Sequence, residues 1–529
     1  MKRWRSLSTA LLAITIVSVG AFMFVTHVGV AHAAAVSEHL VSPTALRFPK
    51  NKQNESPMAV NPTNPNNAIS GANDEIEEPD CTPPSGGSSS CPFVPGVNTS
   101  GVYVTANGGA TWSQQILHWN TSGLVSDGDP VVAFGPKPDG NGGFSYAHGA
   151  RAYFGSLAGS PTFGPDQELV AVSFSDDDGM TWSPPVVATN RDNKVAFNDK
   201  IALWADANPS SPNFGNVYVS WTLFKGTGNF GESNTFSPEP ITFARSTNGG
   251  LSYENSQRLT QSANNGSVGG RQGSTIRSAP DGSVYVFWDG ALQQQDAVLG
   301  IRSTDGGVHF GQRFLVAFKS SNPSPLPGAS FRDNSFPQAD IDGSGNLYVV
   351  WTNYTSGHGV VKLAKSTNQG ASWTVSTAAN VAGRSAFYPA VATSGTNVFI
   401  GFNALDDVAA GTAPGAGVVF YDAYYVLSLN SGATFGAVVK ISATSSDPDA
   451  ATTNGLTAQF IGDYNGAAAG SNGTFWFSWT DTRNGATCAA IDAWRASGFT
   501  TTRPNIYDSC PNGFGNSDIF VATVAPPFP

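Results

Sequence analysis

One eight-residue pattern recurs six times along the chain, and no other feature of the sequence constrains the fold as strongly. It reads Ser or Thr, any residue, Asp or Asn, any residue, Gly, any residue, then Ser, Thr or His, and finally an aromatic residue. Regular recurrence of a short motif indicates an array of similar supersecondary units. The copies occupy residues 105–112, 175–182, 246–253, 303–310, 366–373 and 428–435, so they begin 57 to 71 residues apart.

Each copy follows a short apolar run such as Val-Tyr-Val, which predicts a hairpin turn between two strands. The Asp or Asn side chain is expected to accept a hydrogen bond from a backbone N–H two residues on. The Gly supplies a left-handed backbone position without a steric penalty from a Cβ atom. The closing aromatic residue is expected to fold back onto the sheet that the hairpin joins.

A second, looser repeat consists of a polar start, an apolar strand, a turn, and a second strand that often ends in Trp. Alternating β-branched and aromatic residues bounded by Gly, Asn, Asp or Pro predict strands. The chain has seven such starts but only six copies of the eight-residue pattern, which we call boxes. The last unit, 460–524, has no box but does have a closing strand at 518–524. The starts are at residues 55–60, 129–134, 199–203, 271–276, 334–339, 387–391 and 460–464.

These two repeats predict an all-β fold, a seven-bladed β-propeller with the box hairpins between outer strands. The N-terminal arm is expected to supply a strand to the last blade. A six-bladed propeller is the alternative. The chain from about Glu55 to Val524 resembles the sialidase-like family of Asp-box (BNR-repeat) β-propellers. The resemblance implies that the boxes lie away from the active-site mouth and serve as scaffold.

The N-terminus predicts export. Residues 1–35 combine a basic start, a long apolar run and the small-residue site Ala31-His32-Ala33, which is typical of a cleaved signal peptide. An uncleaved membrane anchor is the alternative, because the apolar run is long enough to span a bilayer. We expect an extended arm at 36–54 and one propeller domain at 55–529. The mature protein is then secreted or extracytoplasmic, or held at the cell surface if the segment stays uncleaved.

The composition excludes some partners. Charged residues make up only 12% of the chain and the net charge is −11, with no basic stripe beyond the N-terminus, so nucleic acid is not expected as a partner. No metal-ligand spacing is present. The run 340–346 is explained more simply as a hairpin turn than as a calcium loop, so no cofactor is expected. The four cysteines predict two local disulfides, Cys81–Cys91 and Cys488–Cys510.

Polar residues at the starts of the innermost strands would surround the mouth of the channel, where carboxylates, arginines and tyrosines suit a polyhydroxylated or anionic ligand. Glu55, Lys200, Gln272 and Asp333 occupy such positions without an assigned role. The candidate catalytic residues are Tyr464, Asp463, Asp129 and Asp199, and the candidate substrate-binding residues are Arg271, Arg332, Tyr388 and Arg483.

The sialidase mechanism that the resemblance implies needs three arginines, a Tyr nucleophile activated by Glu, and an Asp acid. Tyr464 and Asp129 are the matching candidates for nucleophile and acid. Two features depart from the family pattern. Arg47 is followed by polar residues rather than by an apolar inner strand, and no Glu occurs after Glu254, so the activating Glu of a middle blade has no match.

We therefore expect a monomeric glycoside hydrolase, sialidase-like or a related glycan-processing protein, that acts at the channel mouth. Hydrolysis by a pair of Asp residues facing one another is an alternative chemistry on the same scaffold. A non-catalytic propeller that binds a glycan or a protein at the cell surface is the alternative from a different functional class.

Overall fold

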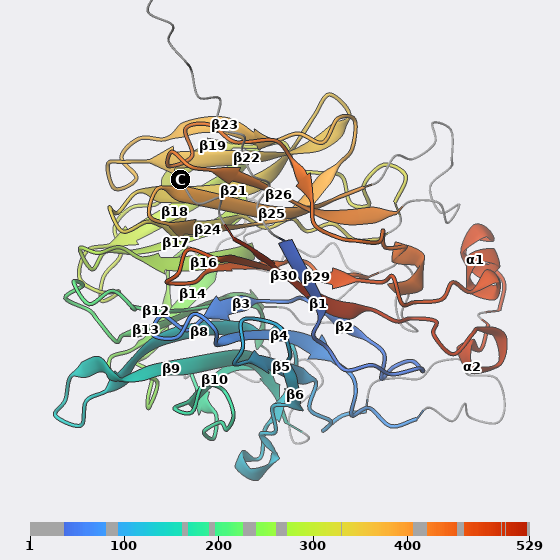
Figure 1. The fold of residues 1–529 in the computed structure, drawn as a ribbon, viewed down its shortest axis with the longest axis horizontal. Helices are drawn as coiled ribbons and strands as arrows, with labels where there is room; N and C mark the ends of the chain where they lie inside the picture. Colours follow the sequence, from blue (N-terminus) through green and yellow to red (C-terminus); the bar gives the residue numbers. More distant parts are fainter. Residues whose placement is uncertain are drawn as a thin grey trace, which may run out of the picture.

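The computed structural model describes residues 36–80, 94–160, 168–189, 196–225, 240–260, 272–329, 331–405, 420–451, 460–498, 500–502 and 504–525. Within them the chain forms seven antiparallel sheets arranged as the blades of a propeller (Figure 1). The seven-bladed prediction is confirmed, and the six-bladed alternative is wrong. The predicted export signal, Cys81, Cys91 and Arg271 lie outside the described residues.

The first three blades carry the first half of the strands. Blade 1 comprises β2 (Gln53–Asn54), β3 (Met58–Val60), β4 (Ala68–Asp74), β5 (Ser100–Thr105) and β6 (Ser113–Ile116). Blade 2 comprises β7 (Val125–Ser126), β8 (Val131–Pro138), β9 (Phe144–Gly159), β10 (Leu169–Ser175) and β11 (Val186–Val187). Blade 3 comprises β12 (Ala196–Ala205), β13 (Val217–Lys225), β14 (Ile241–Ser246) and β15 (Gln257–Arg258).

Blades 4 to 6 each follow one plain four-stranded order. Blade 4 comprises β16 (Gln272–Ser278), β17 (Val284–Leu292), β18 (Gln295–Ser303) and β19 (Phe314–Phe318). Blade 5 comprises β20 (Gln338–Ile341), β21 (Leu347–Thr355), β22 (His358–Ser366) and β23 (Thr374–Ala379). Blade 6 comprises β24 (Ala386–Ser394), β25 (Asn397–Leu405), β26 (Tyr421–Ser428) and β27 (Val439–Lys440).

Blade 7 joins the two ends of the described chain. It contains β28 (Gly466–Ala469), β29 (Phe475–Asp481) and β30 (Asp518–Val524), and its outer strand is β1 (Val36–Leu40). β1 pairs antiparallel with β30, and Figure 1 shows the blue β1 beside the red strands of the C-terminal blade. The predicted N-terminal contribution to the last blade is confirmed, and it explains why blade 7 needs no box.

The six boxes connect the third strand of a blade to its outer strand, as predicted. In the second copy, Asp177 Oδ1 accepts from the Thr181 backbone N–H at 2.8 Å, and Ser175 Oγ accepts from the Gly179 N–H at 2.9 Å. The Asp side chain therefore reaches four residues on rather than the two residues that we expected. The hydrogen bond that spans two residues is made by Ser175 instead, because its Oγ accepts from the Asp177 N–H.

The apolar core lies between neighbouring blades rather than at one centre. Each blade buries its faces against the next, as where Tyr153 and Leu157 of β9 pack with Trp221 of β13. Several box aromatics complete these interfaces by contacting the preceding blade, for example Phe310 against Phe243, with ring centroids 4.9 Å apart. Seven such interfaces close the ring and hold the inner strands in fixed positions around the channel.

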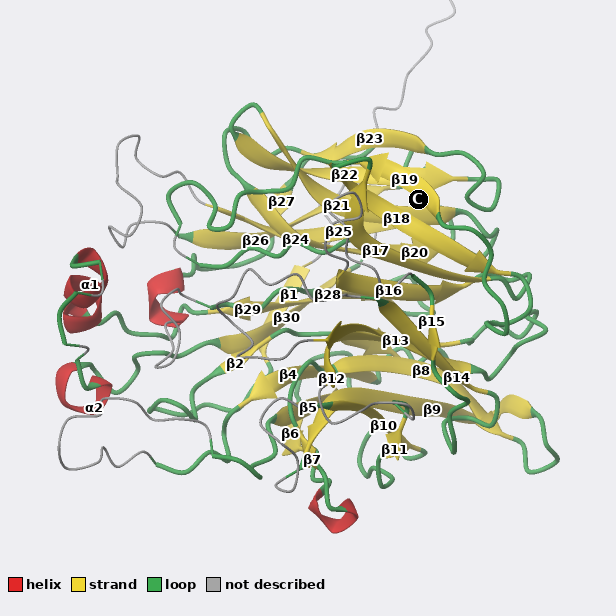
Figure 2. Cartoon of the chain, turned by 180° about the vertical axis from the view of Figure 1, so that it is seen from behind, coloured by secondary structure: helices red, strands yellow, loops and turns green. Residues whose placement is uncertain are grey.

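Two short helices lie at one side of the propeller, α1 (Ala489–Ala496) and α2 (Ile506–Ser509), apart from the yellow strands in Figure 2. The Cys488–Cys510 disulfide joins the two helical segments, which confirms that prediction. A disulfide of this kind is compatible with a location outside the cytoplasm. Among the described residues, no helix has both the length and the apolar character that a membrane span requires.

Candidate active site at the channel mouth

The inner strands begin with strained backbone at the channel mouth. Glu55, Asp129, Lys200 and Tyr388 have positive φ angles of 63°, 49°, 50° and 48°. Left-handed backbone is uncommon for residues other than Gly, and such strain concentrates at functional sites. The pairing of β12 with β13 and of β24 with β25 also shifts register at this point. These bends turn consecutive polar side chains toward the mouth.

Six ionisable side chains from several blades gather there, and we call them the mouth cluster. Four are carboxyl groups and two are cations, so the group is acidic if all of them ionise. The mouth cluster consists of Glu55, Asp129, Asp199, Lys200, Arg332 and Asp463.

Three carboxyl groups from blades 1, 2 and 3 lie near one another in the mouth cluster. Asp129 is the carboxyl neighbour that most affects both Glu55 and Asp199. Asp129 Oδ2 accepts from the Lys200 backbone N–H at 2.7 Å, and Glu55 Oε1 accepts from the Asp463 N–H at 3.0 Å. These contacts hold residues of blades 1, 2, 3 and 7 together at the mouth.

The pKa values follow from this crowding. Burial, and then the charge of Asp129, raises the pKa of both Glu55 and Asp199 well above the ordinary range of a carboxyl group. Burial also raises the pKa of Asp463, although Arg332 opposes that effect. Titratable groups with displaced pKa values in one site are the usual feature of acid–base catalysis. The mouth cluster therefore combines carboxyl groups of raised pKa with two cations.

Lys200 and Tyr464 form the floor of the mouth. The Lys200 ammonium lies 3.6 Å from the centre of the Tyr464 ring, and burial lowers its pKa while the surrounding carboxylates oppose that shift. The Tyr464 hydroxyl donates to the Pro130 carbonyl at 2.9 Å. Burial, followed by the neighbouring carboxylates, raises the pKa of Tyr464 well above its usual value. The Tyr464 hydroxyl thus donates to a backbone carbonyl, and its role as nucleophile stays a prediction.

Arg332 and Asp463 form a bidentate ion pair at the rim of the mouth. Arg332 Nε and Nη2 donate to the two oxygens of Asp463 at 3.1 and 2.5 Å, and the guanidinium stacks on Phe460 at 4.7 Å. The Arg332 side chain is 47% exposed, whereas that of Asp463 is only 8% exposed. Tyr388 supports this arrangement because its hydroxyl donates to the Arg332 carbonyl at 2.6 Å. Arg332 thus reaches solvent while remaining paired.

The structure brings most of the predicted site residues together at the mouth: Asp129, Asp199, Arg332, Tyr388, Asp463 and Tyr464. Glu55 is the most buried carboxyl partner of Asp129, at 3% exposure, yet its sequence carried no stronger signal than its place at a strand start. Lys200 and Gln272 likewise gain their roles only from three-dimensional contacts. Gln272 Nε2 donates to Asp199 Oδ2 at 3.1 Å.

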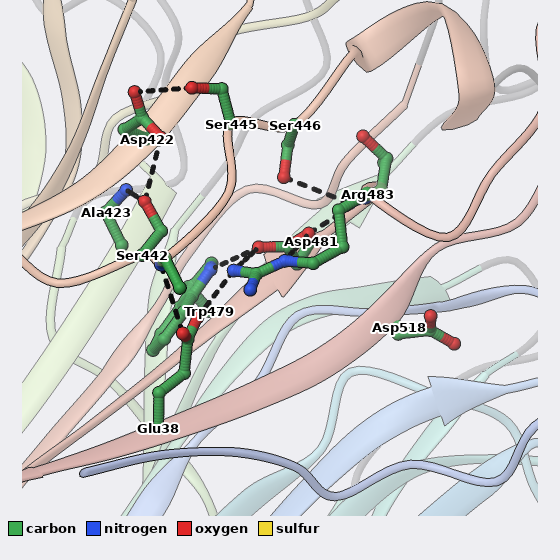
Figure 3. Close-up of polar contacts among 12 residues, drawn as sticks. Glu38, Asp422, Ala423, Ser442, Ser445, Ser446, Trp479, Asp481, Arg483 and Asp518 are labelled. Atoms are coloured by element: carbon green, nitrogen blue, oxygen red, sulfur yellow. Dashed lines mark hydrogen bonds and ion pairs between the residues drawn. The ribbon is translucent and has the colours of Figure 1, made fainter.

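Arg483 lies instead at the junction of β29 with the N-terminal strand. Its Nη2 donates to Glu38 Oε1 at 2.5 Å and to Asp481 Oδ2 at 2.7 Å, as Figure 3 shows. The Arg483 side chain is 11% exposed and stacks on Phe520 at 4.1 Å. The prediction that Arg483 binds substrate finds no support in this geometry, because two carboxylates already engage the guanidinium.

A cavity of about 330 Å³ lies below the mouth, lined by inner strands of all seven blades. Lys200 and Tyr464 border it on the mouth side. It is also bordered by Arg277, which is paired with Asp340 at 3.1 Å. Among the described residues no group of three or more His, Cys, Asp or Glu side chains is arranged to hold a metal ion.

No protein-family model and no curated protein matches the chain. Similar solved structures include the Hadza microbial sialidase Hz136, at 14% identity over 72% of this chain and 70% of that chain, with a TM-score of 0.43. A leech intramolecular trans-sialidase complexed with 2,7-anhydro-Neu5Ac has 13% identity over 67% and 65%, with a TM-score of 0.41. The Penicillium chrysogenum α-L-arabinanase complexed with arabinobiose has 13% identity over 70% and 93%, with a TM-score of 0.39.

These structural neighbours at low identity include sialidases and a trans-sialidase, the kind of protein that the boxes predicted. At this level of similarity they assign no substrate and no catalytic residue to this chain. Its function must be argued from the mouth cluster itself.

Proposed function

We propose that this protein hydrolyses glycosidic bonds of uncharged, polyhydroxylated glycans at the channel mouth. One observation carries the proposal: Glu55, Asp129 and Asp199, carboxyl groups from three successive blades, gather beside Lys200, whose backbone N–H donates to Asp129 Oδ2 at 2.7 Å. Glycoside hydrolysis requires one carboxyl group that donates a proton and one carboxylate that activates water or attacks the sugar. Neighbouring carboxyl groups with separated pKa values supply both roles at one pH.

The contacts suggest a division of roles. Asp199 retains its proton to higher pH and is half-buried rather than enclosed, so it is the candidate general acid. Asp129 is also half-buried and accepts the Lys200 N–H, so it is the candidate carboxylate. Glu55 is buried behind them and accepts from the Asp463 N–H at 3.0 Å, which makes it a positioning residue.

The charge of the site favours an uncharged substrate over a sialoside. Within the described part of the mouth, Arg332 is paired with Asp463 and Lys200 is surrounded by carboxyl groups. A substrate carboxylate would be repelled by the carboxylates of Asp129 and Asp463 and find no unengaged arginine among these described residues. Sugar hydroxyls, in contrast, can donate to carboxylates and accept from protonated carboxyl groups. The sialidase mechanism expected from the resemblance is therefore not the one that we propose.

The experiment is hydrolysis of a panel of neutral chromogenic glycosides, with a sialoside included, by the mature protein. We expect Asp199→Asn and Asp129→Asn each to lower the rate by about 100-fold or more, as loss of a general acid or base does. The control is Asp305→Asn, because four other boxes carry Asn at the corresponding position. This control should leave the rate unchanged.

Three outcomes contradict the proposal. Asp199→Asn could retain full activity, or a sialoside could be the preferred substrate, or the panel could give no turnover while glycans still bind. The last result would favour a non-catalytic binding propeller. Thermal unfolding of each variant shows whether a lost rate comes from lost folding.

We further propose that residues 55–529 act as one exported, monomeric domain that follows a signal at 1–35. The Cys488–Cys510 disulfide supports an oxidising compartment. N-terminal sequencing of the secreted protein tests the cleavage site, since an uncleaved anchor would leave residue 1 in place.

A further inference from the structure

A second polar cavity, of about 350 Å³, lies beside the mouth. We call it the side cavity, and its lining comes from blade 4 and from the segment that leads into blade 5. Its volume is within the range of small-molecule sites. The residues that matter for its chemistry are Gln272, Asp289, Asp296, Lys319, Asn334 and Phe336.

The side cavity is continuous with the mouth cluster through one residue. Gln272 lines the side cavity and donates from Nε2 to Asp199 Oδ2 at 3.1 Å. Gln272 is also the residue of β16 that pairs with Asp289 of β17, and Asp289 lines the side cavity too. A ligand in the side cavity that touched Gln272 would therefore be one residue away from the candidate general acid.

In the side cavity Lys319 neutralises Asp289, whereas Asp296 and Asp333 accept from the neutral donors Ser321 and Asn322. Lys319 Nζ donates to Asp289 Oδ2 at 2.5 Å, and the Lys319 side chain is only 3% exposed while that of Asp289 is 26% exposed. Ser321 Oγ donates to Asp296 Oδ2 at 2.7 Å. The remaining surface offers amide and hydroxyl groups, with Phe336 as its aromatic side chain. Such a lining suits an uncharged molecule with many hydroxyl groups.

The segment that forms this side of the cavity is held in place before any ligand binds. Asn322 Nδ2 donates to Asp333 Oδ2 at 2.8 Å and to the Ala386 carbonyl at 3.0 Å. Ser335 Oγ accepts from the Tyr388 N–H at 3.1 Å, which connects the same segment to blade 6. A preformed site loses little conformational entropy on binding.

We propose that the side cavity binds a further sugar unit of the same neutral glycan that is cleaved at the mouth. The protein then acts on oligosaccharides or polysaccharides rather than on single terminal sugars with small leaving groups. This inference rests on the proposed function for its catalytic half, but binding in the side cavity can be measured without turnover.

The experiment compares single sugars with short oligosaccharides of glucose, xylose, mannose, galactose and arabinose, for both turnover and calorimetric binding. Asn334→Trp fills the side cavity from its rim, and Ser321→Ala removes a hydroxyl beside it. The matched control is Gln312→Trp at an exposed position after the fourth box. We expect Asn334→Trp to weaken oligosaccharide binding and raise KM by about tenfold, as the loss of one or two hydrogen bonds does. Gln312→Trp should leave both binding and turnover unchanged.

The outcomes separate this inference from the proposed function. If no sugar is hydrolysed but oligosaccharides bind and Asn334→Trp alone abolishes binding, the side cavity is supported and the proposed hydrolysis fails. If Asp199→Asn abolishes hydrolysis while Asn334→Trp has wild-type KM values for both long and short substrates, the proposed hydrolysis is supported and the side-cavity inference is overturned. Absence of oligosaccharide binding by the wild type also overturns it.

Discussion

Arg483 connects the strand contributed by the N-terminus to the last blade, so its removal tests how the ring is held closed (Figure 3). The perturbation is Arg483→Met, which keeps the apolar stem and removes the charge. Asp481, whose side chain is fully buried, would lose both guanidinium hydrogen bonds and retain those from the Trp479 indole and the residue-483 backbone N–H. Glu38 would lose its ion pair.

The magnitude follows from burial. Removing one partner of a buried ion pair costs about 3–5 kcal/mol, because the other charge stays buried without compensation. Unfolding entropy is about 2.1 cal/mol/K per residue, which for about 490 residues gives about 1 kcal/mol/K. Arg483→Met should therefore lower Tm by about 3–5 °C.

The assay is scanning calorimetry at one scan rate on the wild type, Arg483→Met, Glu38→Gln and the double variant. Arg313→Met is the control, since Arg313 is exposed in the turn before β19. The double variant should be less destabilised than the sum of the two single variants, because the partners share one interaction. A Tm change below about 1 °C for Arg483→Met, or one equal to that of the control, would refute the reasoning.

Two further predictions concern the mouth. Burial raises the pKa of Asp333 to about 6, so its contribution to stability is present below the unfolded-state pKa and is lost as pH rises through 6. Urea unfolding of wild type relative to Asp333→Asn should show a loss of about 3 kcal/mol between pH 4 and 6, and a flat difference would contradict the shift. Gly273→Ala places a Cβ 2.2 Å from the Phe336 ring, whereas Gly383→Ala, also at positive φ, meets open space. Gly273→Ala should cost about 1–3 kcal/mol more than Gly383→Ala, and equal costs would show that Phe336 moves freely.

Much of the fold could be predicted because turns are encoded locally. A box needs only Ser, Asp or Asn, Gly and an aromatic residue within eight positions, and its hydrogen bonds join residues two or four apart, as Asp177 and Thr181 show. Strand alternation is equally local, so counting the strand starts gave seven blades. The pairing of β1 with β30 was also predictable, because the last unit has no box of its own.

The site was predictable only as a set of positions. The sequence by itself determined that Asp129, Asp199 and Asp463 begin inner strands, since strand starts can be read from residue patterns. Tertiary structure decided that Glu55, Asp129 and Asp199 gather in one cluster, because bent strand starts in separate blades set the direction of each side chain.

Tertiary structure likewise decided which arginine lies at the mouth. Arg332 and Arg483 have similar sequence settings, yet Arg332 pairs with Asp463 at the mouth while Arg483 pairs with Glu38, 445 positions away in the chain. Burial, charge neutralisation and pKa shifts depend on neighbours that are distant in sequence, and a local pattern carries no information about them. The repeats therefore determined the scaffold, and long-range packing determined its chemistry.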